Sequence, residues 1–210
     1  MDDASGFKSL TMPRGKKLEY YLSLPKNFDA TKAYRIVLAI PPGEQTRSLV
    51  DAYSHWLDHF ADRNWIMVSP VTPDGKLFFQ GSERYLPHLM DHIRSEFKPD
   101  GNKFYLLGVS NGGISSFRVA TLHPEQFHSI TVMPGWPKPA DQNRLEKIID
   151  IPVNFVVGEE DDRWRKKSEE FTETLTKMGG NVTLEIVPSQ GHMAFHNYPL
   201  EKLEELLVRK

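Results

Sequence analysis

A serine between two glycines is the strongest chemical feature of the sequence. The segment Gly108-Val109-Ser110-Asn111-Gly112 matches G-x-S-x-G, in which a serine nucleophile stands on a sharp turn between a strand and a helix. The continuously apolar run over 104–109 is typical of a buried strand, and the apolar spacing over 114–120 predicts a helix after the turn. The pentapeptide alone is compatible with an ordinary turn, but this context indicates that Ser110 is a nucleophile.

A serine hydroxyl needs a base to take its proton, and histidine has a suitable pKa. His192 follows Gly191 on a loop after the last predicted strand, which brings its imidazole to the same edge of the sheet as Ser110. We predict that His192 is this base. Its rival is His196, which we expect at the start of the final helix.

Two further pairs of histidines stand four residues apart, His55 with His59 and His88 with His92. This spacing can hold a metal ion. The two pairs belong to separate predicted helices, however, and neither forms an H-E-x-x-H motif. We therefore expect solvated helix faces and no metal site.

The third member of a serine triad is a carboxylate that orients the imidazole. The segment Gly158-Glu159-Glu160-Asp161-Asp162 follows the strand predicted over 153–157 and offers four acids, in the chain order Ser, acid, His that G-x-S-x-G hydrolases use. We prefer Asp161 to Asp162 as the triad acid. Asp162 also suits the N-cap of the next helix, and four consecutive acids are compatible with an ordinary solvated turn.

These residues need a sheet to position them, and strand patterns alternate with helix patterns along the chain. An antiparallel strand with one half-exposed face is predicted over 18–24. Short apolar runs of the kind found in parallel sheets follow, and a less buried strand ends the series. The predicted strands are 35–40, 65–69, 104–109, 128–133, 153–157 and 182–187.

Helical spacing occurs over 49–60, 86–97 and 164–178, and a last helix is expected over about 199–209. This alternation predicts an α/β fold in a single domain over 1–210, with a mostly parallel, doubly wound sheet and helices on both faces. Residues 1–16 are expected to be an N-terminal extension or an edge strand. About twenty residues separate the strands near Met133 and Val153, which leaves no room for a large cap.

The composition is that of a soluble globular protein, with 39% hydrophobic and 26% charged residues. A formal net charge of -2 gives no reason to expect nucleic acid or an acidic membrane as a partner. The absence of cysteine excludes disulfides and a cysteine nucleophile. No signal peptide or membrane-spanning run is visible, so a cytoplasmic protein and an exported one whose signal was removed both stay open. We expect a monomer or a homodimer.

The motifs GVSNGG at 108–113, GEEDD at 158–162 and GH at 191–192 resemble those of the α/β-hydrolase superfamily. The nearest resemblance is to small carboxylesterases, acyl-protein thioesterases and polyhydroxybutyrate-depolymerase-like esterases. It extends from about Leu18 to the C-terminus. It implies a carboxylic-ester hydrolase that forms an acyl-enzyme, acts on a small-molecule ester and needs no cofactor. The family's acid commonly stands three residues after the glycine that closes its strand, which is Asp161 here.

One departure from the family concerns the N–H groups that stabilise the oxyanion. Such hydrolases often carry His-Gly or a glycine run after the strand that corresponds to 35–40, whereas this chain has Pro41-Pro42-Gly43-Glu44. Proline has no N–H to donate. We therefore predict that the N–H of Gly43, or failing that of Glu44 or Gln45, acts with the N–H of Asn111. We expect the Glu44 carboxylate to turn to solvent.

Four apolar side chains are expected on loops near the strand ends, where they would line an acyl or aryl pocket or serve ordinary packing. They are Phe79, Trp136, Met193 and Phe195. Without a large lid, small or medium esters fit better than long-chain triglycerides. A triad alone does not separate esters from amides, so a serine peptidase or an acyltransferase is one alternative. A non-catalytic binding protein with the hydrolase fold is another.

Overall fold

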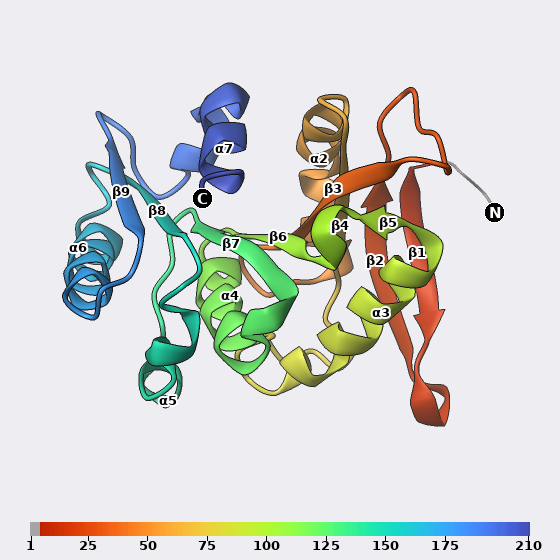
Figure 1. Ribbon diagram of the computed structural model, residues 1–210, viewed down its shortest axis with the longest axis horizontal. Helices are drawn as coiled ribbons and strands as arrows, with labels where there is room; N and C mark the ends of the chain where they lie inside the picture. Colours follow the sequence, from red (N-terminus) through yellow and green to blue (C-terminus); the bar gives the residue numbers. More distant parts are fainter. Residues whose placement is uncertain (1–4) are drawn as a thin grey trace.

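The computed structural model describes residues 5–210, which form one mixed β-sheet with helices on both faces (Figure 1). Within this range the sheet has nine strands in the order β1-β2-β4-β3-β6-β7-β8-β9, and the short β5 pairs with β3 outside that path. The strands are β1 (Gly6–Thr11), β2 (Lys17–Ser23), β3 (Ala33–Ile40), β4 (Trp65–Pro70), β5 (Lys98–Pro99), β6 (Phe104–Gly108), β7 (Phe127–Val132), β8 (Val153–Gly158) and β9 (Val182–Val187).

Most neighbouring strands run parallel, as predicted. β2 is antiparallel to β1 and to β4, whereas the pairs from β4 through β3, β6, β7 and β8 to β9 are parallel. The carboxyl ends of the parallel strands therefore meet at one edge of the sheet, which is where ligands bind in open α/β sheets. The loops after β3, β6 and β8 leave from this edge.

The α-helices are α1 (Arg47–Ala52), α2 (Ser54–Ala61), α3 (Leu86–Glu96), α4 (Asn111–Leu122), α5 (Pro139–Gln142), α6 (Asp162–Lys177) and α7 (Leu200–Leu207). Short 3-10 turns occur at η1 (Pro13–Gly15), η2 (Ser82–Tyr85), η3 (Asp100–Asn102), η4 (Pro124–Gln126), η5 (Leu145–Ile148) and η6 (Ala194–Asn197).

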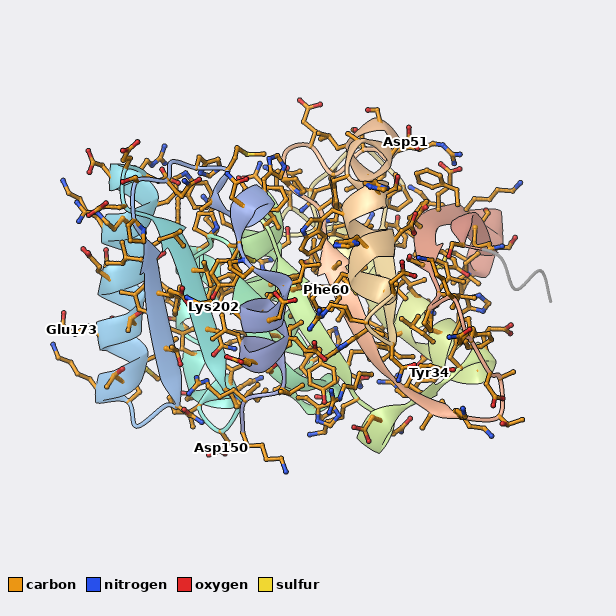
Figure 2. The ribbon with its side chains drawn as sticks, turned by 90° about the horizontal axis from the view of Figure 1, so that it is seen from above. Tyr34, Asp51, Phe60, Asp150, Glu173 and Lys202 are labelled. Carbon is orange, nitrogen blue, oxygen red and sulfur yellow. The ribbon has the colours of Figure 1, made fainter. Side chains whose placement is uncertain are left out.

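Two apolar clusters, one on each face of the sheet, hold these layers together. Residues of α3, α4 and α6 form the first cluster with one set of strand side chains, and residues of α1, α2 and α7 form the second with the alternate set. Figure 1 shows α2 and α7 on one side of the strands and α3 and α4 on the other, and Figure 2 looks down on the α2 and α7 side. The predicted doubly wound arrangement is confirmed, because burial on both faces is what continuously apolar strands require.

The exposure predicted for the first long strand was wrong. The alternation over 18–24 predicted one half-exposed face, but Tyr21 and Ser23 on that face are buried. Helix α2 covers them, and both hydroxyls donate hydrogen bonds to the carboxylate of Asp58. Polar side chains along a strand therefore do not prove that it faces water, because a helix can bring a buried partner.

One helix differs from the sequence prediction, and the N-terminal segment agrees with it. The helical pattern over 49–60 is interrupted at Tyr53, whose φ of -124° and ψ of 17° separate α1 from α2. Strand β1 pairs with β2 at the edge of the sheet, within the segment 1–16 for which an extension or an edge strand was expected. Residues 1–4 of that segment lie outside the described part.

The connection from β7 to β8 contains only the single turns α5 and η5, so the expected absence of a large cap is confirmed. None of the helices in residues 5–210 combines the length and the apolar character needed to cross a membrane.

Candidate active site

Ser110 stands between β6 and α4 in a backbone conformation that L-residues rarely adopt, with φ of 56° and ψ of -118°. Tight backbone packing around it forces this turn. A Cβ on Gly112 would lie 2.1 Å from the carbonyl oxygen of Ile40, and one on Gly108 would lie 2.4 Å from that of Gly112. Only glycine fits at both positions, and the close crossing of strand and helix lifts Ser110 above the strand ends.

His192 and Asp161 complete a hydrogen-bonded chain from this serine. The Ser110 Oγ lies 2.8 Å from His192 Nε2, and His192 Nδ1 lies 2.6 Å from Asp161 Oδ2. Since an ionised carboxylate only accepts, the Asp161 contact assigns a proton to Nδ1 and leaves Nε2 free to accept from the serine hydroxyl. The structure thus brings together the three residues that the sequence selected.

The loops that carry the base and the acid also support each other. The N–H of Glu160 donates to the carbonyl oxygen of Gln190 at 2.9 Å, and a Cβ on Gly158 would lie 2.2 Å from the same oxygen. The acid side chain is 12% exposed and the imidazole is 36% exposed. Asp162, by contrast, is 79% exposed in its side chain and pairs with Arg165.

The remaining histidines lie apart from this chain. His196 is exposed in η6, before the final helix rather than at its start as predicted, and its ring packs on Phe195. His55, His59 and His88 are exposed, whereas His92 is half-buried and hydrogen-bonds to the Tyr20 hydroxyl at 3.0 Å, so the expectation of a solvated face was wrong for that one ring. No group of three or more metal-binding side chains occurs in residues 5–210.

The loop after β3 contacts the first residue of α4, which follows Ser110. Gly43 has a φ of 58°, and its carbonyl oxygen accepts a 3.0 Å hydrogen bond from the Asn111 side chain. Within the described residues, the backbone N–H groups of Gly43 and Asn111 donate no hydrogen bond, so both are free to bind an oxyanion. The N–H of Gln45 is instead used within the turn, where it donates to the carbonyl oxygen of Pro42 at 3.2 Å, and Glu44 is exposed.

Gln45 has a positioning role that sequence reasoning missed. Its side chain is fully buried and its amide nitrogen donates to Pro41 O and to Ser115 Oγ, at 3.2 and 2.9 Å. Its amide oxygen accepts from the N–H of Phe78 at 2.8 Å. One glutamine therefore ties the loop after β3 to α4 and to the loop after β4. A polar side chain within a Pro-Pro-Gly turn gives no local sign of such burial.

Aromatic side chains line the approach to the imidazole, and they are only partly those predicted. Trp164, the first residue of the helical pattern over 164–178, lies with its ring centroid 4.8 Å from that of His192. Trp136 packs on Trp164 at 4.2 Å but is only 7% exposed, so it belongs mainly to the apolar core. The Lys138 ammonium lies 5.4 Å from the ring of Phe79 and 5.5 Å from that of Trp136.

The two residues predicted after the base differ from each other. Met193 is 46% exposed beside His192. Phe195 is only 2% exposed and packs edge-on against Trp56 in the apolar cluster of α2 and α7. The prediction that Phe195 lines a pocket is thus corrected to a packing role, because the η6 turn directs its ring into the core.

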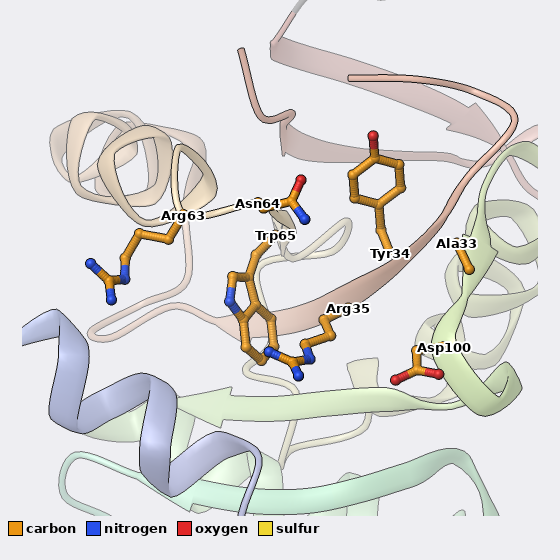
Figure 3. A pocket seen from close by; sticks show the side chains of 7 residues that line it. All are labelled: Ala33, Tyr34, Arg35, Arg63, Asn64, Trp65 and Asp100. Atoms are coloured by element: carbon orange, nitrogen blue, oxygen red, sulfur yellow. The ribbon is translucent and has the colours of Figure 1, made fainter. Parts of the chain in front are cut away.

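A separate hollow of about 330 Å³ lies at the opposite, amino ends of β3 and β4 (Figure 3). Its arginines already have partners: Arg63 bonds to Glu201 and Glu204, and Arg35 stacks over the ring of Trp65. The lining residues are Ala33, Tyr34, Arg35, Arg63, Asn64, Trp65 and Asp100. It therefore contains none of the groups gathered around Ser110.

No protein-family model matches the sequence. Among solved structures, a ferulic acid esterase aligns over 97% of this chain and 98% of its own, with 14% identity and a TM-score of 0.78. An S-formylglutathione hydrolase from Agrobacterium tumefaciens aligns over 98% and 95%, with 15% identity and a TM-score of 0.75.

A thermostable esterase aligns over 97% of this chain, with 18% identity and a TM-score of 0.75. This chain spans only 62% of that esterase. At such identities the likeness is one of architecture, and it agrees with the strand order and the turn at Ser110. The chain therefore has the α/β-hydrolase fold.

Proposed function

We propose that the protein is a serine hydrolase of carboxylic esters, with Ser110 as nucleophile, His192 as general base and Asp161 as the acid that orients the base. The observation that carries the proposal is the hydrogen-bonded chain of 2.8 and 2.6 Å that joins these three side chains at the strand-to-helix turn. The 2.8 Å distance is within the reach that proton transfer from Ser110 to His192 requires, and the 2.6 Å contact orients the imidazole.

In the first step, His192 Nε2 takes the hydroxyl proton as Ser110 Oγ attacks the ester carbonyl carbon. The N–H groups of Gly43 and Asn111 donate to the developing oxyanion, and the N-terminus of α4 favours negative charge at the same place. The imidazolium then gives its proton to the leaving alcohol. Asp161 stabilises that imidazolium and keeps its orientation.

In the second step, a water molecule attacks the acyl-serine and gives a proton to His192. Collapse of the new tetrahedral intermediate releases the carboxylic acid and returns the proton to Ser110. Every step uses groups of this chain and water. The connection from β7 to β8 is too short for a cap, which favours small or medium esters.

Three of the similar structures are named as an esterase, a ferulic acid esterase and an S-formylglutathione hydrolase, which supports ester hydrolysis, whereas another, of which this chain spans 35%, is named as a putative dipeptidyl aminopeptidase IV. Rates on 4-nitrophenyl esters of increasing chain length, set against aminoacyl anilides, test this preference. We expect ester turnover that falls at least about 10⁴-fold in kcat in Ser110→Ala while the melting temperature is kept. Ester turnover that survives in Ser110→Ala would refute the assignment, and faster cleavage of anilides would make the protein a peptidase.

A further inference from the structure

Two packed indoles next to the base form an aromatic surface that leads away from Ser110, with Trp164 partly exposed and Trp136 only 7% exposed beneath it. Trp164 packs on the imidazole of His192, and Trp136 packs on Trp164. The loop that carries Trp136 is fixed close to the nucleophile, because a Cβ on Gly113 at the start of α4 would lie 2.2 Å from the carbonyl oxygen of Pro134. A substrate held at Ser110 therefore has this surface beside it.

Two cations stand over the far end of this surface. The Lys138 ammonium lies 5.5 Å from the ring centroid of Trp136, and the Arg163 guanidinium carbon lies 5.8 Å from it. Lys138 comes from the loop after β7 and Arg163 from the first turn of α6, so two separate elements bring positive charge to one indole.

Neither cation is neutralised by a carboxylate of residues 5–210. Other arginines of the same region are neutralised by carboxylates. Arg118 and Arg144 pair with the buried Asp141, and Arg165 pairs with Asp162. An aromatic ring attracts a cation without cancelling its charge, so Lys138 and Arg163 keep a full positive charge available for an anion.

We propose that the substrate is an ester that also carries a carboxylate, which Lys138 and Arg163 bind while its apolar part lies on the partly exposed Trp164, which Trp136 supports from the core. The inference rests on the proposed function, since it concerns a second group of the molecule whose ester bond Ser110 attacks. It assigns substrate selection to charge as well as to the aromatic surface.

Two pairs of esters that differ only in charge test the proposal with the full chain. For a carboxylate on the acyl side, mono-(4-nitrophenyl) glutarate is compared with its methyl ester. For a carboxylate on the alcohol side, 4-acetoxybenzoate is compared with methyl 4-acetoxybenzoate. We expect kcat/KM to be about 10-fold or more higher for the anionic member of at least one pair, with a ratio that decreases as salt is added.

The variants Lys138→Gln and Arg163→Gln should each lower this anionic-to-neutral ratio by about 3- to 10-fold, because each removes one charge-assisted contact. Lys147→Gln is the matched control, since Lys147 is exposed in η5 and, unlike Lys138, has no cation–π contact with an aromatic ring of the described residues. It should leave the ratio unchanged.

Ser110-dependent hydrolysis with equal kcat/KM for both members of both pairs would overturn the inference and leave the proposed function standing. So would a ratio that the double variant of Lys138 and Arg163 does not change. If no ester is hydrolysed in a Ser110-dependent way, the proposed function itself is wrong and the inference falls with it.

Discussion

The turn that carries Ser110 is packed backbone against backbone, whereas the loop that carries His192 lies near the surface. Around Ser110, Gly112 and Gly113 leave no space for a Cβ, because carbonyl oxygens of Ile40 and Pro134 lie where it would be. On the other loop, a Cβ on Gly191 would meet nothing within 4 Å, and Met193 is exposed.

This difference separates stability from chemistry. The nucleophile takes its position from the core of the fold, so changes at its glycines should unfold the protein. The base takes its position from Asp161, from the ring of Trp164 and from the packing of Gln190 on the loop after β8. Gly191 and the imidazole itself have space around them, so changes there should reduce activity and leave the fold intact.

The largest expected effect concerns the carboxylate that orients His192. Asp161→Asn replaces the carboxylate with an amide, whose NH2 can donate to Nδ1 and so favour the wrong imidazole tautomer, and we expect kcat for a 4-nitrophenyl ester to fall about 10⁴-fold, by analogy with other serine triads. Asp162→Asn is the control, because that carboxylate is exposed and, among residues 5–210, pairs with Arg165 alone. Its activity should change less than about 3-fold, as expected of an exposed ion pair. The reverse pattern would exchange the roles of the two aspartates.

The next effect concerns the nucleophile side. In Gly112→Ala the new methyl group overlaps Ile40 O, a backbone atom that cannot move away alone. We expect a loss of about 4 kcal/mol in the free energy of unfolding, or failure to fold. Gly191→Ala has open space and should lose less than about 1 kcal/mol. Urea denaturation measures both, and equal losses would contradict the comparison.

The third prediction concerns Gln45, which ties the loop after β3, where Gly43 lies, to α4. Gln45→Met keeps the volume but removes three hydrogen bonds and leaves the buried Phe78 N–H without its acceptor. We expect about 2 kcal/mol of lost stability. Because the loop that holds Gly43 loses its support, kcat should fall about 10-fold with KM nearly unchanged, as for a lost transition-state contact. An unchanged kcat would show that the glutamine is structural only.

The smallest effect concerns the loop after β4. Burial raises the pKa of Asp74, but hydrogen bonds from the Ser82 hydroxyl and the Lys76 N–H, together with the charges of Lys16 and Arg84, outweigh it and leave the pKa below its ordinary 3.8. A lowered folded-state pKa gives stability that is present above the ordinary value and is lost as pH falls through the folded value.

Asp74→Asn should therefore lower the free energy of unfolding by about 1 kcal/mol at pH 7, and by progressively less below about pH 4. Urea denaturation at a series of pH values measures the difference. A difference that grows as pH falls would have the wrong sign for this account.

The features that could be predicted from the sequence are those determined by residues close together in the chain. The turn at Ser110 follows from glycines and a buried strand within ten residues, and strand β8 ends three residues before Asp161. The parts that it did not predict depend on distant segments. Gln45 forms hydrogen bonds with Ser115 and Phe78, and Trp164 of α6 packs on the imidazole of His192, which lies on the loop after β9. Helical spacing identified Trp164 only as the first residue of the pattern over 164–178.

Labelling with a fluorophosphonate, followed by intact-mass and peptide mass spectrometry, tests the central claim most directly. The account predicts one adduct per chain, located on Ser110, absent in Ser110→Ala and formed far more slowly in Asp161→Asn. A wild-type protein that takes up no label, or a Ser110→Ala variant that is labelled as fast as the wild type, would contradict it.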